Sequence, residues 1–194
     1  KGLIYLKKTK FLLSLLAMCI ASLFISNGRP AYAKEEISLD DVYKVYKDVL
    51  TDKDYNAKTF GLKDINNDGI PELLVNNAYG IFTYKDNNYV WLWDSWVICE
   101  MYYSPTTNRI LYHYEWKGDE DWAVYEIDMD KGEMSTIVYY SQSNGIYYKN
   151  YETETTKTEV EETIEKMVPD RELLTTPYDN TEENRAKYLP TTAL

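Results

Sequence analysis

The chain has 194 residues, and its charges are unevenly distributed along it. Five of the 21 Lys and Arg residues lie within the first 33 positions, and no acidic residue precedes Glu35, so residues 34–194 carry 16 cations against 32 anions. Binding to nucleic acid or to an anionic membrane surface needs clustered basic residues, so this composition argues against both functions.

The first 33 residues have the three parts of a secretory signal peptide. A basic segment ends at Lys10, an apolar stretch runs from Phe11 to Ile25, and Ala31 and Ala33 provide the small-residue pattern of a cleavage site. An apolar stretch of about 15 residues is shorter than the roughly 18 needed to span a bilayer. We therefore predict that residues 1–33 are a signal peptide and that the mature protein is secreted or held at the cell surface, without a membrane anchor.

Residues 34–194 have the length of one globular domain, which we expect to be a monomer. Cys99 is the single cysteine after the predicted cleavage site, so this part of the chain cannot form an internal disulfide. Cys99 and the one histidine, His113, are too few ligands for a closed zinc site. His113 alternates with Tyr112 and Tyr114, and we expect it to face solvent from a strand.

Hydrophobic spacing predicts a helix followed by a sheet. Apolar residues recur every three or four positions from Ser38 to Leu50, which indicates an amphipathic helix that begins at a Ser38 cap. Over residues 73–149 the period changes to two, with turn residues at intervals, which is typical of an antiparallel β-meander. Within it, residues 119–121 are all acidic, and we expect them to form a solvated turn.

Helical spacing returns in a C-terminal region, residues 158–190. Thr158 and Glu161 predict the start of one helix and Pro169 its end, and a second helix is expected from Asn180 to Leu189. The predicted fold class is therefore α+β, with an N-terminal helix, a calcium-type loop over residues 64–75, a β-meander and C-terminal helices.

The most specific motif precedes the predicted meander. Oxygen-bearing side chains at alternate positions of a tight loop can converge on one Ca²⁺ ion, and Gly69 permits the positive φ that turns the chain back. The candidate ligands are the side chains of Asp64, Asn66, Asp68 and Glu72 and the carbonyl oxygen of Ile70. The alternative is an ordinary turn rich in Asp, Asn and Gly. An EF-hand is excluded because Val75 occupies the position of its closing glutamate.

This segment resembles the calcium loops of FG-GAP and VCBS-type repeats, which lead directly into a β-strand. It is also similar to the D-x-D-x-D-G-x-P-E-L segment of small exported proteins of Gram-positive bacteria. The resemblance implies Ca²⁺ as the cofactor and supports the five ligands named above. It differs from those repeats in having a single copy and in having Glu72 where Asp is commoner.

Aromatic residues provide a second candidate site. Tyr89, Trp91 and Trp93 alternate along a predicted strand and are expected to share one face, where they would form a stacking platform for sugar rings. The simpler interpretation, which we favour, is that these residues belong to the core of a sheet.

The sequence contains no set of nucleophile, base and orienting residue, so we predict a non-catalytic domain. The hypothesis is an exported, calcium-stabilised extracellular or cell-surface binding domain, in which Ca²⁺ stabilises the junction between helix and sheet. Its partner is unknown, with glycan or cell wall as candidates. The alternatives are a carboxylate-based glycan-active enzyme and a secreted inhibitor or immunity-type protein.

Overall fold

A computed structural model describes residues 37–95, 97, 99–129 and 131–192 of the chain. The predicted signal peptide, residues 1–33, lies outside these ranges. Residues Ser38–Leu194 form one compact unit. Within the described ranges, no helix has both the length and the apolar character needed to cross a membrane.

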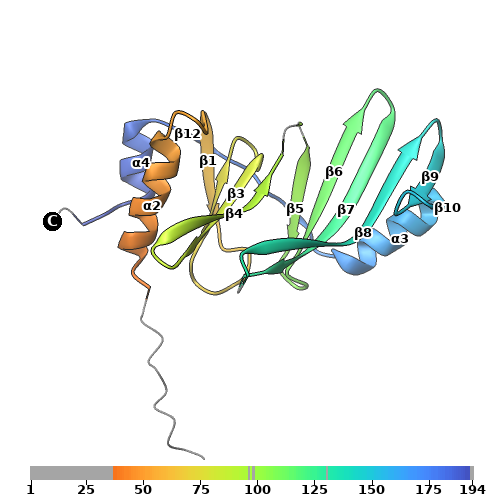
Figure 1. The fold of residues 1–194 in the computed structure, drawn as a ribbon, viewed down its shortest axis with the longest axis horizontal. Coiled ribbons are helices and arrows are strands. Elements are labelled where there is room, and N and C mark those ends of the chain that lie inside the picture. The colour runs from red at the N-terminus through yellow and green to blue at the C-terminus, as the bar shows by residue number, and fades with distance from the viewer. Residues whose placement is uncertain (1–36, 96, 98, 130, 193–194) are drawn as a thin grey trace, which may run out of the picture. The chain divides into compact units, whose positions relative to one another are not determined.

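The described residues form two antiparallel sheets (Figure 1). Sheet A contains, in spatial order, β12 (Tyr178–Asp179), β1 (Thr59–Lys63), β2 (Glu72–Val75), β3 (Gly80–Lys85) and β4 (Asn88–Asp94). Sheet B contains β10 (Thr153–Thr155), β9 (Ile146–Lys149), β8 (Glu133–Ser143), β7 (Asp119–Asp128), β6 (Arg109–Trp116), β5 (Glu100–Ser104) and β11 (Glu172–Leu173).

The predicted α+β class, with one meander and C-terminal helices, is wrong. The protein is mainly antiparallel β-structure, with 44% strand and three short helices in the described part of the chain. The chain leaves sheet A at Asp94 and enters sheet B at Glu100, so the expected meander is divided between two sheets. Apolar and aromatic residues dominate the strands on both sides of this change, NYVWLWD in β4 and EMYYS in β5, and so the sequence pattern does not reveal it.

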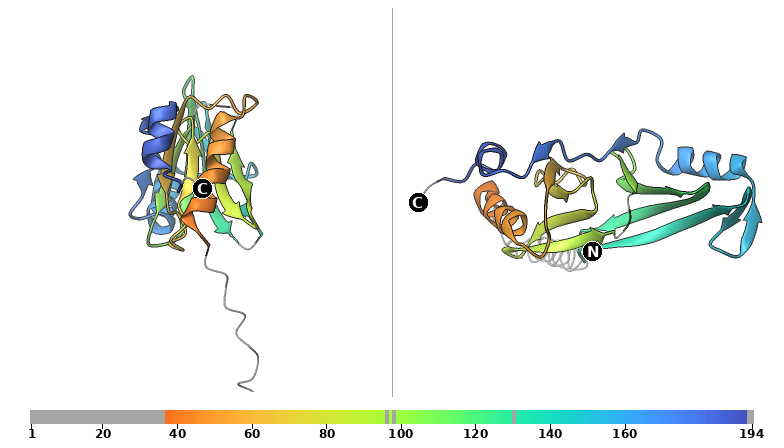
Figure 2. Two further views of the ribbon diagram at one scale, coloured as in Figure 1. Left: turned by 90° about the vertical axis from the view of Figure 1, so that its left-hand side faces the viewer. Right: turned by 90° about the horizontal axis from the view of Figure 1, so that it is seen from above.

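The C-terminal region 158–190 is also not purely helical. After α3 (Lys157–Met167), the chain adds β11 to one edge of sheet B and β12 to one edge of sheet A before it forms α4 (Glu182–Tyr188). The right-hand view in Figure 2 shows this segment running past both sheets. Each added strand has only two residues, which is too short for a hydrophobic period to be recognised.

The first helix, α2 (Leu39–Thr51), begins where the sequence predicted, with Ser38 as its N-cap. Helix α3 begins earlier than expected, because Thr156 rather than Thr158 is the cap and its hydroxyl accepts a hydrogen bond from the Glu159 amide at 3.2 Å. Both threonines are followed by Glu at the third position, so the sequence alone offers two equivalent capping boxes. The cap of α4 is Thr181.

Three cores separate four layers. Helix α2 packs on one face of sheet A, where the buried residues include Val42, Tyr46, Val49, Phe60, Leu73 and Phe82. The other face of sheet A packs against sheet B through residues that include Leu74, Ile81, Leu92, Met101, Tyr103 and Ile110. Helix α3 covers the far face of sheet B through residues that include Leu111, Val124, Val138, Val160 and Ile164. The order of layers is therefore helix, sheet, sheet, helix (Figure 1).

Candidate functional site

The predicted calcium loop connects two paired strands of sheet A. Lys63 at the end of β1 is paired with Glu72 at the start of β2, so residues 64–71 form the turn of a β-hairpin. The expected position between helix and sheet is therefore wrong, since β1 precedes the loop. Strand β1 has the sequence TFGLK, in which Gly61 interrupts the apolar pattern, and this strand was not predicted.

Side chains within the loop bond to its own backbone. Asp64 accepts hydrogen bonds from the amides of Asp68 at 3.2 Å and Gly69 at 2.9 Å, and Asp68 accepts one from the Ile70 amide at 2.8 Å. Asn66 accepts from the Asp68 amide at 3.1 Å and donates to the Asp68 carboxylate at 2.8 Å. Gly69 has a φ of 88°, as its position in the motif predicted. These bonds wind the loop tightly and bring its polar side chains together.

Glu72 is the one candidate ligand that is fully buried, with 0% of its surface exposed. Its carboxylate accepts hydrogen bonds from the Ile65 amide at 2.9 Å and from the Thr83 hydroxyl at 3.1 Å. None of the ion pairs in the described ranges involves it. Burial raises the pKa of Glu72 to about 8, and the nearby carboxylates of Asp68 and Asp64 contribute to the rise.

The loop contacts three layers of the protein. The Tyr46 hydroxyl of α2 donates a hydrogen bond to the Pro71 carbonyl oxygen at 2.9 Å. Asn67 donates to the hydroxyl of Tyr103, on sheet B, at 3.2 Å. Ile65 is completely buried in the core between the two sheets. The conformation of this loop is therefore coupled to the packing of α2, sheet A and sheet B.

The oxygen atoms of the candidate ligands suit a hard cation, but the side chains are not arranged around a common centre. Among the described residues, no group of three or more His, Cys, Asp and Glu side chains has a metal-binding arrangement. The loop carboxylates instead face backbone amides, and each carboxylate oxygen that accepts one such bond keeps a second lone pair. An uncompensated buried carboxylate beside two further acids is an environment that a bound cation would relieve.

The structure separates the three residues of the predicted aromatic platform. Strand β4 contains a bulge, because Trp91 pairs with Phe82 and Trp93 pairs with the adjacent Ile81. Tyr89 and Trp91 consequently lie on the α2 side of sheet A, whereas Trp93 packs in the core between the sheets. The expectation that all three share one face is wrong. Trp91 remains 44% exposed and stacks on Phe82 with ring centroids 5.4 Å apart.

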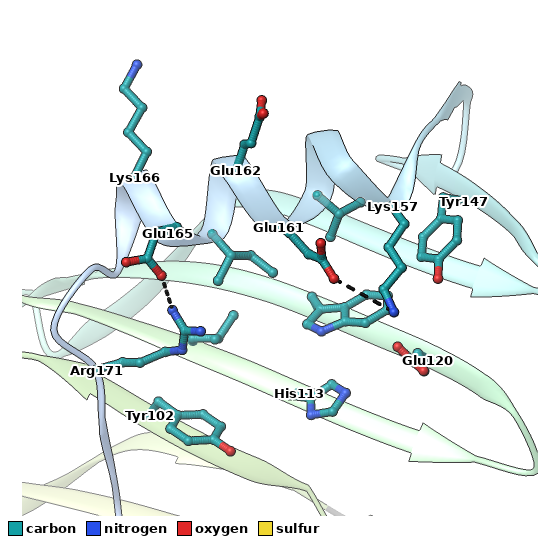
Figure 3. Close-up of a pocket in the computed structure, with 14 residues that line it drawn as sticks. Tyr102, His113, Glu120, Tyr147, Lys157, Glu161, Glu162, Glu165, Lys166 and Arg171 are labelled. Atoms are coloured by element: carbon teal, nitrogen blue, oxygen red, sulfur yellow. Dashed lines mark hydrogen bonds and ion pairs between the residues drawn. The ribbon is translucent and has the colours of Figure 1, made fainter.

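The sequence interpretation missed a pocket between α3 and sheet B (Figure 3). His113 does not face open solvent but lines this pocket, stacked against Trp122, and its Nε2 has no hydrogen-bond partner among the described residues. Glu120 also lines the pocket from β7, rather than lying in a solvated turn. In the sequence, these residues are recognisable only as members of alternating strands. His113 and Trp122 become neighbours through the register of β6 and β7.

Comparison of the chain with family models, with curated proteins and with solved structures gave no match. The resemblance to FG-GAP and VCBS-type loops therefore stays a prediction, as does the identity of the metal. Calcium is favoured by the chemistry of the loop itself, since each candidate ligand offers an oxygen atom and none offers an imidazole nitrogen or a sulfur atom.

Proposed function

We propose that the mature chain is a secreted or cell-surface interaction domain that is stabilised by Ca²⁺ and has no catalytic activity. The observation that carries this proposal is the buried carboxylate of Glu72, which has no cationic partner in the described ranges and lies close enough to Asp64 and Asp68 for their charges to raise its pKa. A divalent cation at the loop would compensate all three carboxylates.

The side chains of Asp64, Asn66, Asp68 and Glu72 would hold the ion, together with the Ile70 carbonyl oxygen. These ligands span nine consecutive residues, so binding would fix the β1–β2 turn with little rearrangement elsewhere. With three carboxylates, the loop belongs to the weak class of calcium sites, and we expect a Kd on the order of 10⁻⁴ to 10⁻³ M. Such a site is filled outside the cell, where calcium is millimolar, which agrees with the predicted signal peptide.

The effect of the metal would be structural. Tyr46 connects the loop to α2, and Asn67 connects it to Tyr103 of sheet B. An ion that orders the loop therefore stabilises the contacts among three layers.

The surroundings of the one histidine argue only against catalysis by a nucleophile–histidine pair. The Nδ1 atom of His113 lies 3.4 Å from a carboxylate oxygen of Glu100, and no Ser or Cys bonds to the ring among the described residues. The imidazole therefore has a carboxylate neighbour but no nucleophile to activate. A carboxylate-based glycan-active enzyme would need no histidine and stays the alternative to a binding domain.

Thermal melts of the purified chain in EDTA, in excess Ca²⁺ and in excess Mg²⁺ test the calcium site. At ~100 times the Kd, ligand binding stabilises by about 2.7 kcal/mol, which raises Tm by roughly 5 to 10 °C in a domain of this size. We expect this rise with Ca²⁺ in the wild type and in Asp48→Ala, which removes an exposed helical acid, and its loss in Asp68→Ala. An equal rise in Asp68→Ala, or none in the wild type, would reject the site.

A further inference from the structure

The pocket between α3 and sheet B has a volume of about 890 Å³. It is lined by residues of β5, β6, β7 and β9 on the sheet side and by residues of α3 on the other (Figure 3). This volume lies within the range of about 300 to 1,000 Å³ that is typical of sites for small organic ligands.

Three stacked rings form the base of the pocket. Trp122 is parallel to His113 within 12°, with ring centroids 5.4 Å apart, and lies within 24° of Tyr147, with centroids 6.1 Å apart. The rings come from three different strands, so the rigid sheet fixes their spacing. This aromatic base offers apolar surface to a ligand, while the tyrosine hydroxyl adds a polar atom at its margin.

Charged groups of both signs line the pocket. Of its four glutamates and three Lys and Arg residues, Glu162 and Lys166 point away from the sheet, which leaves three glutamates with Lys157 and Arg171 around the aromatic base (Figure 3). The Lys157 Nζ atom lies 3.7 Å from a carboxylate oxygen of Glu161, and a guanidinium nitrogen of Arg171 lies 3.0 Å from a carboxylate oxygen of Glu165. Figure 3 shows Lys157 and Glu161 pointing from α3 toward the sheet.

We propose that this pocket binds a neutral carbohydrate. The C–H face of a pyranose ring is apolar and matches the aromatic base, whereas its hydroxyl groups both donate and accept hydrogen bonds. Glu120 and Glu161 can accept from these hydroxyl groups, and Lys157 can donate to them. A nearly balanced set of charges disfavours a strongly charged ligand, because such a ligand would leave one sign of charge uncompensated.

This inference rests on the binding role proposed above and names its partner class, but it does not depend on the calcium loop. The pocket residues lie on sheet B, on α3 and, for Arg171, on the segment between α3 and β11, and none belongs to residues 64–72. The site is also distinct from Tyr89 and Trp91, which lie on the α2 side of sheet A.

The test is calorimetric titration of the purified chain with four oligosaccharides, in calcium and in EDTA. Cellohexaose and chitohexaose are the neutral probes, and hexagalacturonate and a hexameric chitosan are the acidic and basic probes. We expect a neutral probe to bind with a Kd of about 1 mM or tighter. Trp122→Ala should weaken binding at least about tenfold, as should Lys157→Ala and Glu161→Gln, because each removes a contact to the sugar.

Matched variants locate the binding site. Trp116→Ala removes a tryptophan that is 58% exposed and does not line the pocket, and Trp91→Ala removes the exposed ring on sheet A. Both should bind like the wild type. Lys157 and Glu161 are exposed, so their variants decide the question even if the half-buried Trp122→Ala variant does not fold.

Several results would overturn the proposal: no binding of either neutral probe, binding restricted to a charged probe, or undiminished binding in Lys157→Ala and Glu161→Gln. A calcium-dependent rise in Tm without sugar binding would reject the pocket alone. Sugar binding without a calcium-dependent rise would reject the calcium part of the proposed function alone.

Discussion

Thr83 on β3 donates its hydroxyl to the Glu72 carboxylate on β2 at a distance of 3.1 Å, and both residues are buried within sheet A. A carboxylate inside a sheet is unfavourable unless its charge is compensated, because burial removes its hydration. The Ile65 amide and the Thr83 hydroxyl each donate a hydrogen bond to the Glu72 carboxylate, but neither group carries a positive charge. The same residue is therefore a source of instability without metal and a ligand with it.

Glu72→Gln separates these two effects. The amide keeps the shape of the side chain and can bond to Ile65 and Thr83, but it carries no charge. In EDTA at neutral pH we expect a Tm roughly 5 °C above that of the wild type, because a raised pKa of Glu72 destabilises the fold at pH values above its ordinary pKa of 4.5, and the difference should disappear below that pH. In calcium we expect no further rise, because a ligand has been lost.

The control for Glu72→Gln is Glu152→Gln, an exposed residue in the turn before β10. It should leave both the Tm in EDTA and the calcium response unchanged. If Glu72→Gln lowers Tm in EDTA, the buried charge is not a source of instability and the argument for a cation at this position is lost.

Cys99 should react slowly in the folded protein. It is a free thiol with 8% of its surface exposed, and burial raises its pKa, with only partial opposition from the Ser95 hydroxyl. Because the thiolate is the reactive form, the native reaction rate should keep rising with pH beyond the pH at which a free thiol levels off.

The measurement for Cys99 is titration with a chromogenic disulfide reagent from pH 7 to pH 10, on protein that begins at residue 34 so that one thiol reports. Denaturant should accelerate the reaction at pH 7 by at least about a hundredfold, because unfolding exposes the thiol and removes the burial that raises its pKa. A native rate equal to the denatured rate would contradict the buried position.

The first helix and the tight turn around Gly69 could be recognised from the sequence because their signals are local. Ser38, the cap of α2, is followed by apolar residues at helical spacing. Gly69 follows a run of Asp and Asn residues that is typical of a tight turn, and it has the positive φ that such a turn needs. The layered arrangement could not be recognised, because it depends on which strands pair. Nothing near Asp94 marks the change of sheet, and the two-residue strands β11 and β12 have no period of their own.

The candidate sites differ in the same way. Residues of the loop are consecutive, and so a motif can describe them. The pocket unites His113, Trp122 and Tyr147, which are brought together only by strand register and by the position of α3. The bulge at Leu92 places Trp93 on the face of sheet A opposite to that of Trp91. In the sequence, aromatic and aliphatic residues alternate through this position without interruption.

Gly61 is essential for attaching the C-terminal segment to sheet A. A Cβ atom at this position would lie 2.4 Å from the Thr175 carbonyl oxygen, which is a backbone atom of the segment between β11 and β12. Gly61→Ala should therefore force the segment away and reduce the free energy of unfolding by about 2 to 3 kcal/mol.

Urea denaturation with limited proteolysis tests the Gly61 prediction, because displacement should expose residues 174–181 to early cleavage. Gly145→Ala is the comparison, since its added Cβ meets open space and its φ of 81° costs only about 1 kcal/mol. Equal stability of Gly61→Ala and the wild type would show that the segment moves without penalty.

Trp91 and Trp93 should respond differently to substitution, although they are two residues apart on β4. Trp93 packs against Tyr112 at 5.7 Å and Tyr125 at 5.1 Å between centroids, so it joins sheet A to sheet B. Trp93→Ala should lower the free energy of unfolding by about 3 to 5 kcal/mol, as is typical of removing a large core ring.

Trp91→Ala should cost only about 1 kcal/mol, because 44% of its surface remains in solvent and its ring contacts are limited to Phe82, stacked at 5.4 Å, and Tyr55, edge-on at 5.2 Å. Urea denaturation of both variants measures the difference, and retention of the Trp91→Ala variant on a glycan matrix tests the remaining part of the aromatic platform. Equal destabilisation would mean that the bulge at Leu92 does not separate the two rings. Loss of glycan retention in a stably folded Trp91→Ala protein would place a sugar-binding surface on the α2 side of sheet A.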